Sequence, residues 1–194
     1  MRNRLAILFL VSMTVLLNGC GYNTIQKNDE AVIAAWGNVE AAYQRRADLI
    51  PNLVEAVKAY AAHEKETFTA VTEARASLGK IKIGADVVND PAAFAAFQAA
   101  QGGMTSALSK LMVVAENYPE LKANENFRDF QHQLEGTENR INVSRTRYND
   151  AVRVFNTSIR TFPNNLTNKL LLKLPRREAF KAEAGSETAP KVKF

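Results

Sequence analysis

Few side chains in this sequence have the types and spacing that catalysis or metal binding requires. The 194 residues include one cysteine, Cys20, and two histidines, His63 and His132. A single cysteine excludes an intramolecular disulfide and a zinc site built from several cysteines. His63 is followed by Glu64, but not by the second histidine that a zinc-protease helix carries. We therefore expect no catalytic residues, no metal site and no cofactor.

Four charged residues lie where a helix would otherwise present apolar side chains. Between Val32 and Leu78, apolar residues recur every three or four positions, and Arg46 and Glu64 take two of those positions. Arg145 takes such a position in the later stretch from Phe127 to Phe162. Glu138 lies two turns before Arg145 on nearly the same face. A charge between packed helices is costly unless it is paired and hydrogen-bonded. Arg46 and Glu64 would lie about 27 Å apart on one helix. We therefore expect partners across helices and predict that Arg145 meets Glu64 or Glu138.

These charges allow two interpretations. In the first, which we favour, the pairs fix the register of the helices, which is the best-attested role of buried polar groups. In the second, they form a polar binding site between the helices. The variant Arg145→Leu separates the two. Unfolding or scrambled oligomers would support the first, and lost activity in a stable fold would support the second.

The elements that must position these residues are helices, because the apolar residues follow three-and-four spacing. Three such stretches run from Val32 to Leu78, from Phe94 to Tyr118 and from Phe127 to Phe162. Asp90-Pro91 and Asn124 are typical helix starts before the second and third stretches. No stretch alternates usefully with a period of two residues, so strands are not expected. The sequence predicts an all-α fold, an antiparallel up-and-down bundle of three long helices.

Proline and glycine complicate this pattern at three places. Pro51 falls inside the first stretch. Either one long helix bends near Pro51, or a first helix stops near Arg46 and Asp48 caps a second. Both alternatives give about four helical segments. The unbroken spacing favours the bend. Residues 81–90 show no helical period and are expected to form a loop. Gly102-Gly103 indicates close helix packing or a local bend in the next helix.

The N-terminus has the features of an export signal. Arg2 and Arg4 precede a mostly apolar run over residues 5–17. That run is shorter than the roughly 20 residues that cross a bilayer. Residues 17–20, Leu-Asn-Gly-Cys, resemble the lipobox of bacterial lipoproteins, in which the chain is cut before a cysteine and the cysteine is acylated, as with palmitate. The alternative is an uncleaved short anchor with an incidental cysteine.

The lipobox resemblance implies a division of the N-terminal region and a location. It implies a signal peptide over residues 1–19 and a lipidated anchor and linker over residues 20–28, attached to the membrane through Cys20. Gly21 is not the aspartate that retains lipoproteins in the inner membrane. The resemblance therefore implies the outer membrane of a Gram-negative bacterium, facing the periplasm.

Several further motifs occur in a fixed order over residues 22–163. They are Tyr22-Asn23, residues 35–40, residues 45–54 with His63-Glu64, residues 118–123, the run from Glu138 to Asn149, Asn156, and Phe162-Pro163. Together they resemble the LemA family of bacterial membrane-attached proteins. The resemblance implies a helical bundle, here residues 29–163, outside the cytoplasm behind an N-terminal membrane segment, with no established enzymatic activity.

The chain departs from this family pattern at both ends. It has a lipobox where many relatives keep a transmembrane helix, and its tail from Leu166 to Phe194 has little to align. Residues 164–194 form a basic tail, in which lysines and arginines lie among several leucines. The basic residues singled out are Lys169, Lys173, Arg176 and Arg177. Such a segment could bind anionic lipid or cell-wall polymer. The alternative is a short helix packed on the bundle, followed by a solvated end.

These observations predict a membrane-anchored envelope lipoprotein that acts as a non-catalytic scaffold or adaptor for an envelope protein partner. The alternative is a module that binds anionic lipid, cell-wall polymer or a small anionic ligand through the basic tail or the buried arginines. Nucleic acid is not expected as a partner, because an exported lipoprotein rarely meets it. The sequence leaves the oligomeric state open, and a homo-oligomer is one arrangement that it allows.

Overall fold

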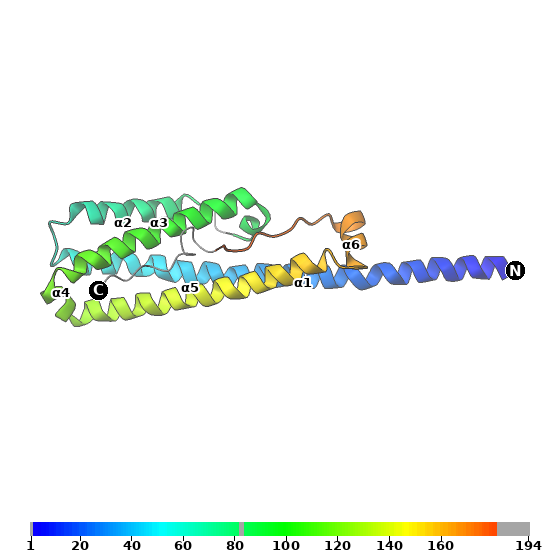
Figure 1. Cartoon of the computed structure of the whole chain (residues 1–194), viewed down its shortest axis with the longest axis horizontal. Coiled ribbons are helices and arrows are strands. Elements are labelled where there is room, and N and C mark those ends of the chain that lie inside the picture. Colours follow the sequence, from blue (N-terminus) through cyan, green and yellow to red (C-terminus); the bar gives the residue numbers. More distant parts are fainter. Residues whose placement is uncertain (1, 82–83, 182–194) are drawn as a thin grey trace, which may run out of the picture.

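The computed structural model describes residues 2–81 and 84–181, and for residues 2–20 it describes the backbone alone. Over these residues the protein is all α, without a strand (Figure 1). The helices are α1 (Arg2–Lys58), α2 (Lys65–Gly79), α3 (Pro91–Glu116), α4 (Pro119–Ala123), α5 (Glu125–Ser158) and α6 (Asn164–Thr167), with a 3-10 turn at Ala85–Asn89 and a π turn at Asn168–Leu172. The predicted all-α bundle is confirmed.

The long helices alternate in direction along the bundle. α1 packs on α5, and α2 packs on α3, so the bundle consists of two helix pairs (Figure 1). α1 continues alone beyond the other helices toward the N-terminus (Figure 1). We call the end of the bundle where α6 lies the anchor end, and the opposite end, which carries α4, the tip.

The break in the first apolar stretch lies at residues 59–64 and not near Pro51. α1 continues past Pro51, and the chain leaves the helix only after Lys58. The N–H of Ala61 donates to the carbonyl of Val57 at 2.9 Å and closes a last turn there. The first stretch therefore forms two helices, and the bundle has four long helices instead of three.

Side-chain caps begin two of the long helices, as predicted. Oδ1 of Asp90 accepts hydrogen bonds from the N–H groups of Ala92 and Ala93, at 2.8 and 3.3 Å. Oδ1 of Asn124 accepts one from the N–H of Phe127 at 3.1 Å. These bonds satisfy backbone donors that the start of a helix leaves without an intrahelical partner.

Two expectations about irregular segments need correction. The predicted loop over residues 81–90 contains the 3-10 turn, and its Val87 and Val88 are buried in the core. Gly102 and Gly103 lie within continuous α3, and a Cβ at either position would meet no described atom from outside its own stretch of helix within 4 Å. The two glycines therefore do not mark a close approach of helices.

The core consists of two hydrophobic clusters arranged along the bundle. The anchor-end cluster surrounds Trp36, whose ring contacts four other aromatic rings at centroid distances of 5.1–6.2 Å. Those rings belong to Phe94, Phe97, Tyr148 and Phe180. The tip cluster includes Ile50, Leu53, Met104, Leu111 and Phe127. The second halves of α1 and α3 and the first half of α5 supply much of the tip cluster.

The segments next to both predicted bundle boundaries belong to the packed structure. Residues 21–28, expected as a linker, lie in α1, and Ile25 is fully buried. At the other end, residues 174–181, which we call the strap, run back along α5, and Phe180 enters the anchor-end cluster (Figure 1). Residues 182–194 lie outside the described part of the chain. So do the side chains of Cys20 and of the expected signal peptide.

Candidate functional site

A polar layer separates the two hydrophobic clusters. On α1, Arg46 lies between Tyr43 of the anchor-end cluster and Ile50 of the tip cluster. Gln101 on α3 and Glu138 on α5 lie at the matching positions of their helices. Arg46 is 2% exposed and Gln101 is 5% exposed, so the layer crosses the interior of the bundle.

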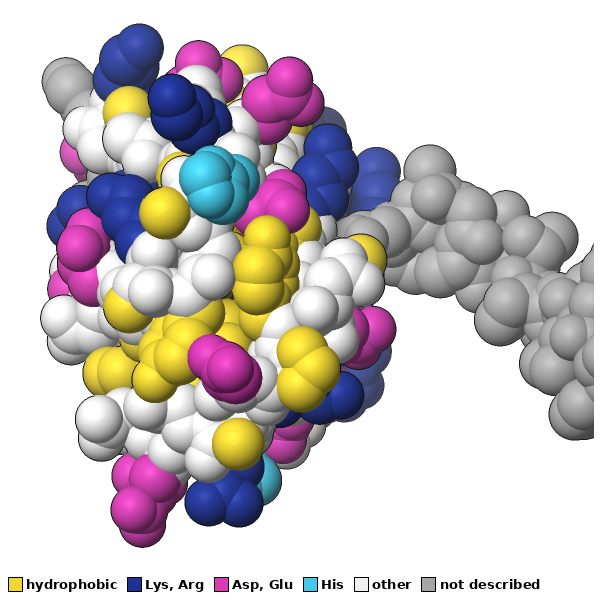
Figure 2. Space-filling model, turned by 90° about the vertical axis from the view of Figure 1, so that its left-hand side faces the viewer, with side chains coloured by type: hydrophobic (Ala, Val, Ile, Leu, Met, Phe, Trp, Pro, Cys, Tyr) yellow, Lys and Arg dark blue, Asp and Glu magenta, His cyan; other side chains and the backbone are white. Residues whose placement is uncertain are grey.

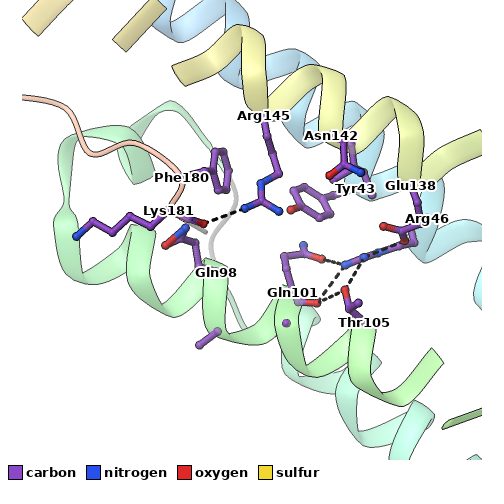
Figure 3. A pocket seen from close by; sticks show the side chains of 13 residues that line it. Tyr43, Arg46, Gln98, Gln101, Thr105, Glu138, Asn142, Arg145, Phe180 and Lys181 are labelled. Atoms are coloured by element: carbon purple, nitrogen blue, oxygen red, sulfur yellow. Dashed lines mark hydrogen bonds and ion pairs between the residues drawn. The ribbon is translucent and has the colours of Figure 1, made fainter. Parts of the chain in front are cut away.

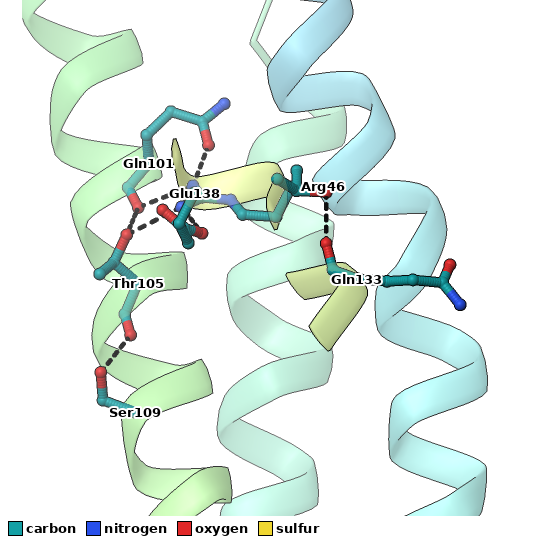
Figure 4. Close-up of polar contacts among 7 residues, drawn as sticks. Arg46, Gln101, Thr105, Ser109, Gln133 and Glu138 are labelled. Atoms are coloured by element: carbon teal, nitrogen blue, oxygen red, sulfur yellow. Dashed lines mark hydrogen bonds and ion pairs between the residues drawn. The ribbon is translucent and has the colours of Figure 1, made fainter. Parts of the chain in front are cut away.

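The guanidinium of Arg46 joins three helices through this layer (Figure 4). Its Nη1 donates to Oε1 of Glu138 and to Oγ1 of Thr105, both at 3.0 Å. Its Nη2 donates to the backbone and side-chain oxygens of Gln101, at 3.3 and 2.5 Å. The guanidinium also lies 5.0 Å from the ring centroid of Tyr43. One cation thus holds α1, α3 and α5 at a single register.

Among the described residues, Arg145 does not meet a carboxylate, and its expected partners Glu64 and Glu138 bind elsewhere. Its Nη2 donates to the backbone carbonyl of Lys181 at 3.2 Å, and its guanidinium lies 4.8 Å from the ring centroid of Phe180. Glu138, the nearest expected partner along α5, pairs with Arg46 instead. The position of Arg145 therefore depends on the strap, which sequence spacing did not place.

Arg46 and Arg145 line one pocket of about 390 Å³ between α1, α3, α5 and the strap (Figure 3). Its other polar side chains include the amides of Gln98 and Asn142, whereas the side chain of Lys181 points away from Arg145 (Figure 3). Glu138 supplies the lining carboxylate. The side chain of Arg145 extends from α5 into the space between α5 and α3 (Figure 3). The pocket is therefore polar and carries more positive than negative side chains.

Glu64 lies apart from this layer, at the tip. It accepts a hydrogen bond from Oη of Tyr118 at 3.1 Å. Desolvation of the phenol and the neighbouring carboxylate raise the pKa of Tyr118 above its ordinary value. The structure thus brings together Arg46 and Glu138 from the predicted set, places Arg145 in the adjoining pocket and leaves Glu64 elsewhere.

The four basic residues of the tail have different environments. Lys169, Lys173 and Arg176 are exposed. Arg177 is 6% exposed, its Nη2 donates to Oδ1 of Asp29 at 2.8 Å, and its guanidinium lies 5.2 Å from the ring centroid of Phe155. Arg177 is therefore a packed part of the fold and not a surface contact.

The sequence did not reveal the role of three asparagines that hold the strap. The side-chain amide of each accepts a hydrogen bond from the N–H of one strap residue and donates to the carbonyl of the same residue. The pairs are Asn149 with Phe180, Asn156 with Arg177 and Asn168 with Leu174, at 2.8–3.1 Å. The spacing of Asn149 and Asn156, seven residues apart on the face of α5 near the seam, was the available signal.

The residues with described side chains do not form a metal site or a membrane span. Among them, no cluster of three or more His, Cys, Asp or Glu residues could hold a metal ion. Within the same part of the chain, no helix is long and apolar enough to cross a membrane.

Comparison with known protein families identifies the family of this chain. The family model described as LemA family matches residues 35–194. The chain belongs to the LemA family. Its match reaches the C-terminus, so the tail expected to have little to align is part of the LemA region. The structure gives the physical reason, because the strap packs its Phe180 into the core.

Known LemA-like relatives of this chain include magnetosome proteins. It is 28% identical over 183 residues to the magnetosome proteins MamQ 1 and MamQ 2 of Paramagnetospirillum magneticum (strain ATCC 700264 / AMB-1), covering 86% of this chain and 67% of each relative. It is 27% identical over 176 residues to the magnetosome protein MamQ of Magnetospirillum gryphiswaldense, covering 82% of this chain and 64% of that protein. This LemA chain thus spans about two thirds of the length of these relatives.

Proposed function

We propose that this protein is an envelope lipoprotein whose LemA bundle is a non-catalytic scaffold for a protein partner. Acylated Cys20 attaches it to a membrane. The observation that carries the proposal is the continuity of α1, which runs through Cys20 to Lys58 at the tip. With Ile25 buried, little free chain separates Cys20 from the bundle. A lipid on Cys20 would therefore hold the whole bundle close to the membrane, with the tip facing away.

The tip offers a surface that suits a protein partner. Apolar side chains gather in the middle of this end (Figure 2). A pocket of about 270 Å³ here is lined by Tyr60, Tyr118, Pro119 and Glu120. Hydrogen bonds hold both tyrosines, since Nδ2 of Asn124 donates to Oη of Tyr60 at 3.0 Å and Oη of Tyr118 donates to Glu64.

Tyrosines are frequent at interfaces, and their rings bind cations. Glu120 adds a negative charge to the tip pocket. We therefore propose a partner that inserts a lysine or arginine side chain between the tyrosines.

Crosslinking in intact cells tests the scaffold. A photoreactive phenylalanine analogue at Tyr60 should crosslink one reproducible envelope protein. The same analogue at Val113, which is 61% exposed on α3, should not. Recovery of lipid alone, or of the same proteins from both positions, would count against a partner at the tip.

The attachment through acylated Cys20, which we call the tether, and the membrane in which the protein lies need separate measurements. Mass spectrometry of the purified protein should find a chain that begins at acylated Cys20. The variant Cys20→Ser should keep its leader and lack the acyl chains. An intact leader with a free thiol in the unaltered protein would refute the tether. Density separation of the two membranes should place the protein in the outer membrane, which Gly21 favours by resemblance to other lipoproteins.

A second candidate function is binding of a small anionic ligand in the pocket beside Arg145. This candidate is favoured by the number of partners that the charged side chains of the pocket already have. Glu138 is already paired with Arg46, whereas Arg145 makes one hydrogen bond within the described part of the chain. A carboxylate or phosphate group could accept further hydrogen bonds from this guanidinium.

Thermal-shift measurements with phosphate and with peptidoglycan fragments test this candidate. Binding should raise the melting temperature, and added salt should weaken the effect. Arg145→Gln should abolish the shift, whereas Arg147→Gln, at an exposed position of the same helix, should leave it intact. An equal shift in both variants would exclude the pocket.

A further inference from the structure

The anchor end carries a large share of the exposed apolar surface. Nine large hydrophobic side chains are exposed among the described residues, and five of them lie at this end, with exposed fractions of 42–73%. They are Tyr22, Phe162, Leu166, Leu170 and Leu171, which we call the anchor-end patch. Exposed apolar side chains concentrated in one region of a protein indicate a surface that contacts something.

The patch lies directly beside the expected membrane attachment. A Cβ added to Gly21 would meet Oδ1 of Asn164 at 2.9 Å and Oγ1 of Thr167 at 3.0 Å. α6 therefore touches the turn of α1 that follows Cys20, at the place where α1 leaves the bundle (Figure 1). Since Ile25 is fully buried, α1 cannot move away from α6 without opening the core.

The charges around the patch match an anionic bilayer. Residues 159–177 contain basic residues and no Asp or Glu. Arg177 is paired with Asp29, but Arg160, Lys169 and Lys173 are exposed. Basic side chains close to a membrane are attracted by anionic headgroups. Apolar side chains flanked by lysines are typical of segments that lie in the interface of a bilayer.

We infer that the anchor-end patch is a membrane-contact surface. The leucines of the α6 region and Phe162 enter the boundary between headgroups and acyl chains, while Lys169 and Lys173 face anionic headgroups. This inference rests on the proposed tether, because Cys20 brings the patch to the bilayer. Its consequence is a second, non-covalent contact that stops the bundle from swinging about its lipid anchor.

Depth measurements on the full, acylated protein in vesicles test the contact. A nitroxide is attached to Leu170→Cys, and in a matched variant to Val113→Cys on α3; the two positions are 68% and 61% exposed. The vesicles contain phosphatidylcholine with or without phosphatidylglycerol. Relaxation of each nitroxide by oxygen, which concentrates among acyl chains, is compared with relaxation by a water-soluble nickel chelate.

A membrane contact predicts a ratio of oxygen to nickel relaxation several-fold higher at position 170 than at position 113. Lys169→Gln and Lys173→Gln should each lower the equilibrium constant for insertion about fivefold in anionic vesicles, since each lysine contributes about 1 kcal/mol there. Equal ratios at the two positions would overturn the inference. So would a label at position 170 that is shielded from both reagents, because that result indicates a protein contact. Insertion unaffected by the two lysine variants would overturn the role of anionic headgroups.

The same preparation separates failure of the contact from failure of the tether. If the protein without an added cysteine takes up the label, Cys20 is a free thiol and the proposed tether is wrong. If it remains unlabelled while position 170 stays in water, the tether stands and the membrane contact is wrong.

Discussion

At the residue scale, the buried cation of Arg46 determines which side chains can surround it, because its N–H donors need hydrogen-bond acceptors from neighbouring residues. Glu138, Thr105 and Gln101 supply the acceptors from two other helices. Sequence spacing identified Arg46 and Glu138 as charges near a helix seam. It could not pair them, because they are 92 residues apart and their contact depends on how far α5 slides along α1.

Loss of the Glu138 carboxylate should destabilise the fold. Glu138→Ala leaves the Arg46 cation without its ion-pair partner, and such losses cost 3–5 kcal/mol when the pair is fully buried. The Glu138 side chain is 38% exposed, so we expect about 2 kcal/mol less free energy of unfolding in urea denaturation. Glu135→Ala, one turn earlier at an exposed position, should cost about 0.5 kcal/mol or less. Equal effects of the two variants would show that Arg46 does not depend on the carboxylate.

Tyr148 should make stability depend on alkaline pH. Its Oη donates to the carbonyl of Glu178 at 2.9 Å, and burial raises its pKa well above the ordinary value. The folded protein therefore keeps a proton that the unfolded chain releases near pH 10, so stability is full below about pH 10 and falls as the pH rises further.

Denaturation at about pH 8 and about pH 11 measures the alkaline loss. Tyr148→Phe should lower stability at the lower pH by about 1 kcal/mol, through the lost hydrogen bond, and should flatten the decline. Tyr22→Phe, at an exposed position, is the control. An unchanged decline in Tyr148→Phe would contradict this assignment.

At the element scale, the strap takes the place of a further helix against α5. Asn149 and Asn156 lie about 10.5 Å apart along the helix, and three residues of extended chain cover about 10 Å. Two amides of α5 can therefore reach Arg177 and Phe180, which are three residues apart in the strap. In a β-sheet, a neighbouring strand would donate to and accept from the strap with its backbone N–H and carbonyl groups. Here the side-chain amides of α5 make the same pair of hydrogen bonds.

Removing one of these amides should loosen the strap before it unfolds the bundle. Asn156→Ala leaves the N–H and carbonyl of Arg177 without their partners, at a cost of about 1–3 kcal/mol. In hydrogen-exchange measurements, the amides of residues 177 and 180 should then exchange roughly 5–150-fold faster. Asn142→Ala, at an exposed position of α5, is the matched control. If both variants exchange alike, the asparagine does not hold the strap.

The elements that the sequence could predict are those with local signals. Apolar spacing identified the stretches that become long helices, and Asp90 and Asn124 identified two starts because a cap acts within three residues. The break after Lys58 carried no such signal, since residues 59–64 favour helix and continue the apolar spacing. The strap was missed because its partners lie 21 and 31 residues away in sequence.

At the scale of the whole molecule, the two ends of the bundle are built differently. The tip is a four-helix arrangement with its own apolar cluster, whereas at the anchor end α1, α5, the start of α3, the 3-10 turn and the strap surround Trp36. The polar layer at Arg46 marks the change between them. Two of the charges that the sequence indicated, Arg46 and Glu138, thus lie at the boundary between two regions, for which we propose a protein partner at one end and the membrane at the other.

The unbroken run of α1 from Gly21 to Lys58 also defines a height. At 1.5 Å per residue, those 38 positions extend about 57 Å. A bundle standing upright on its lipid would therefore present Tyr60 and Tyr118 at nearly that distance above the bilayer. A protein held in this way would bind only molecules that project to the same height above the bilayer.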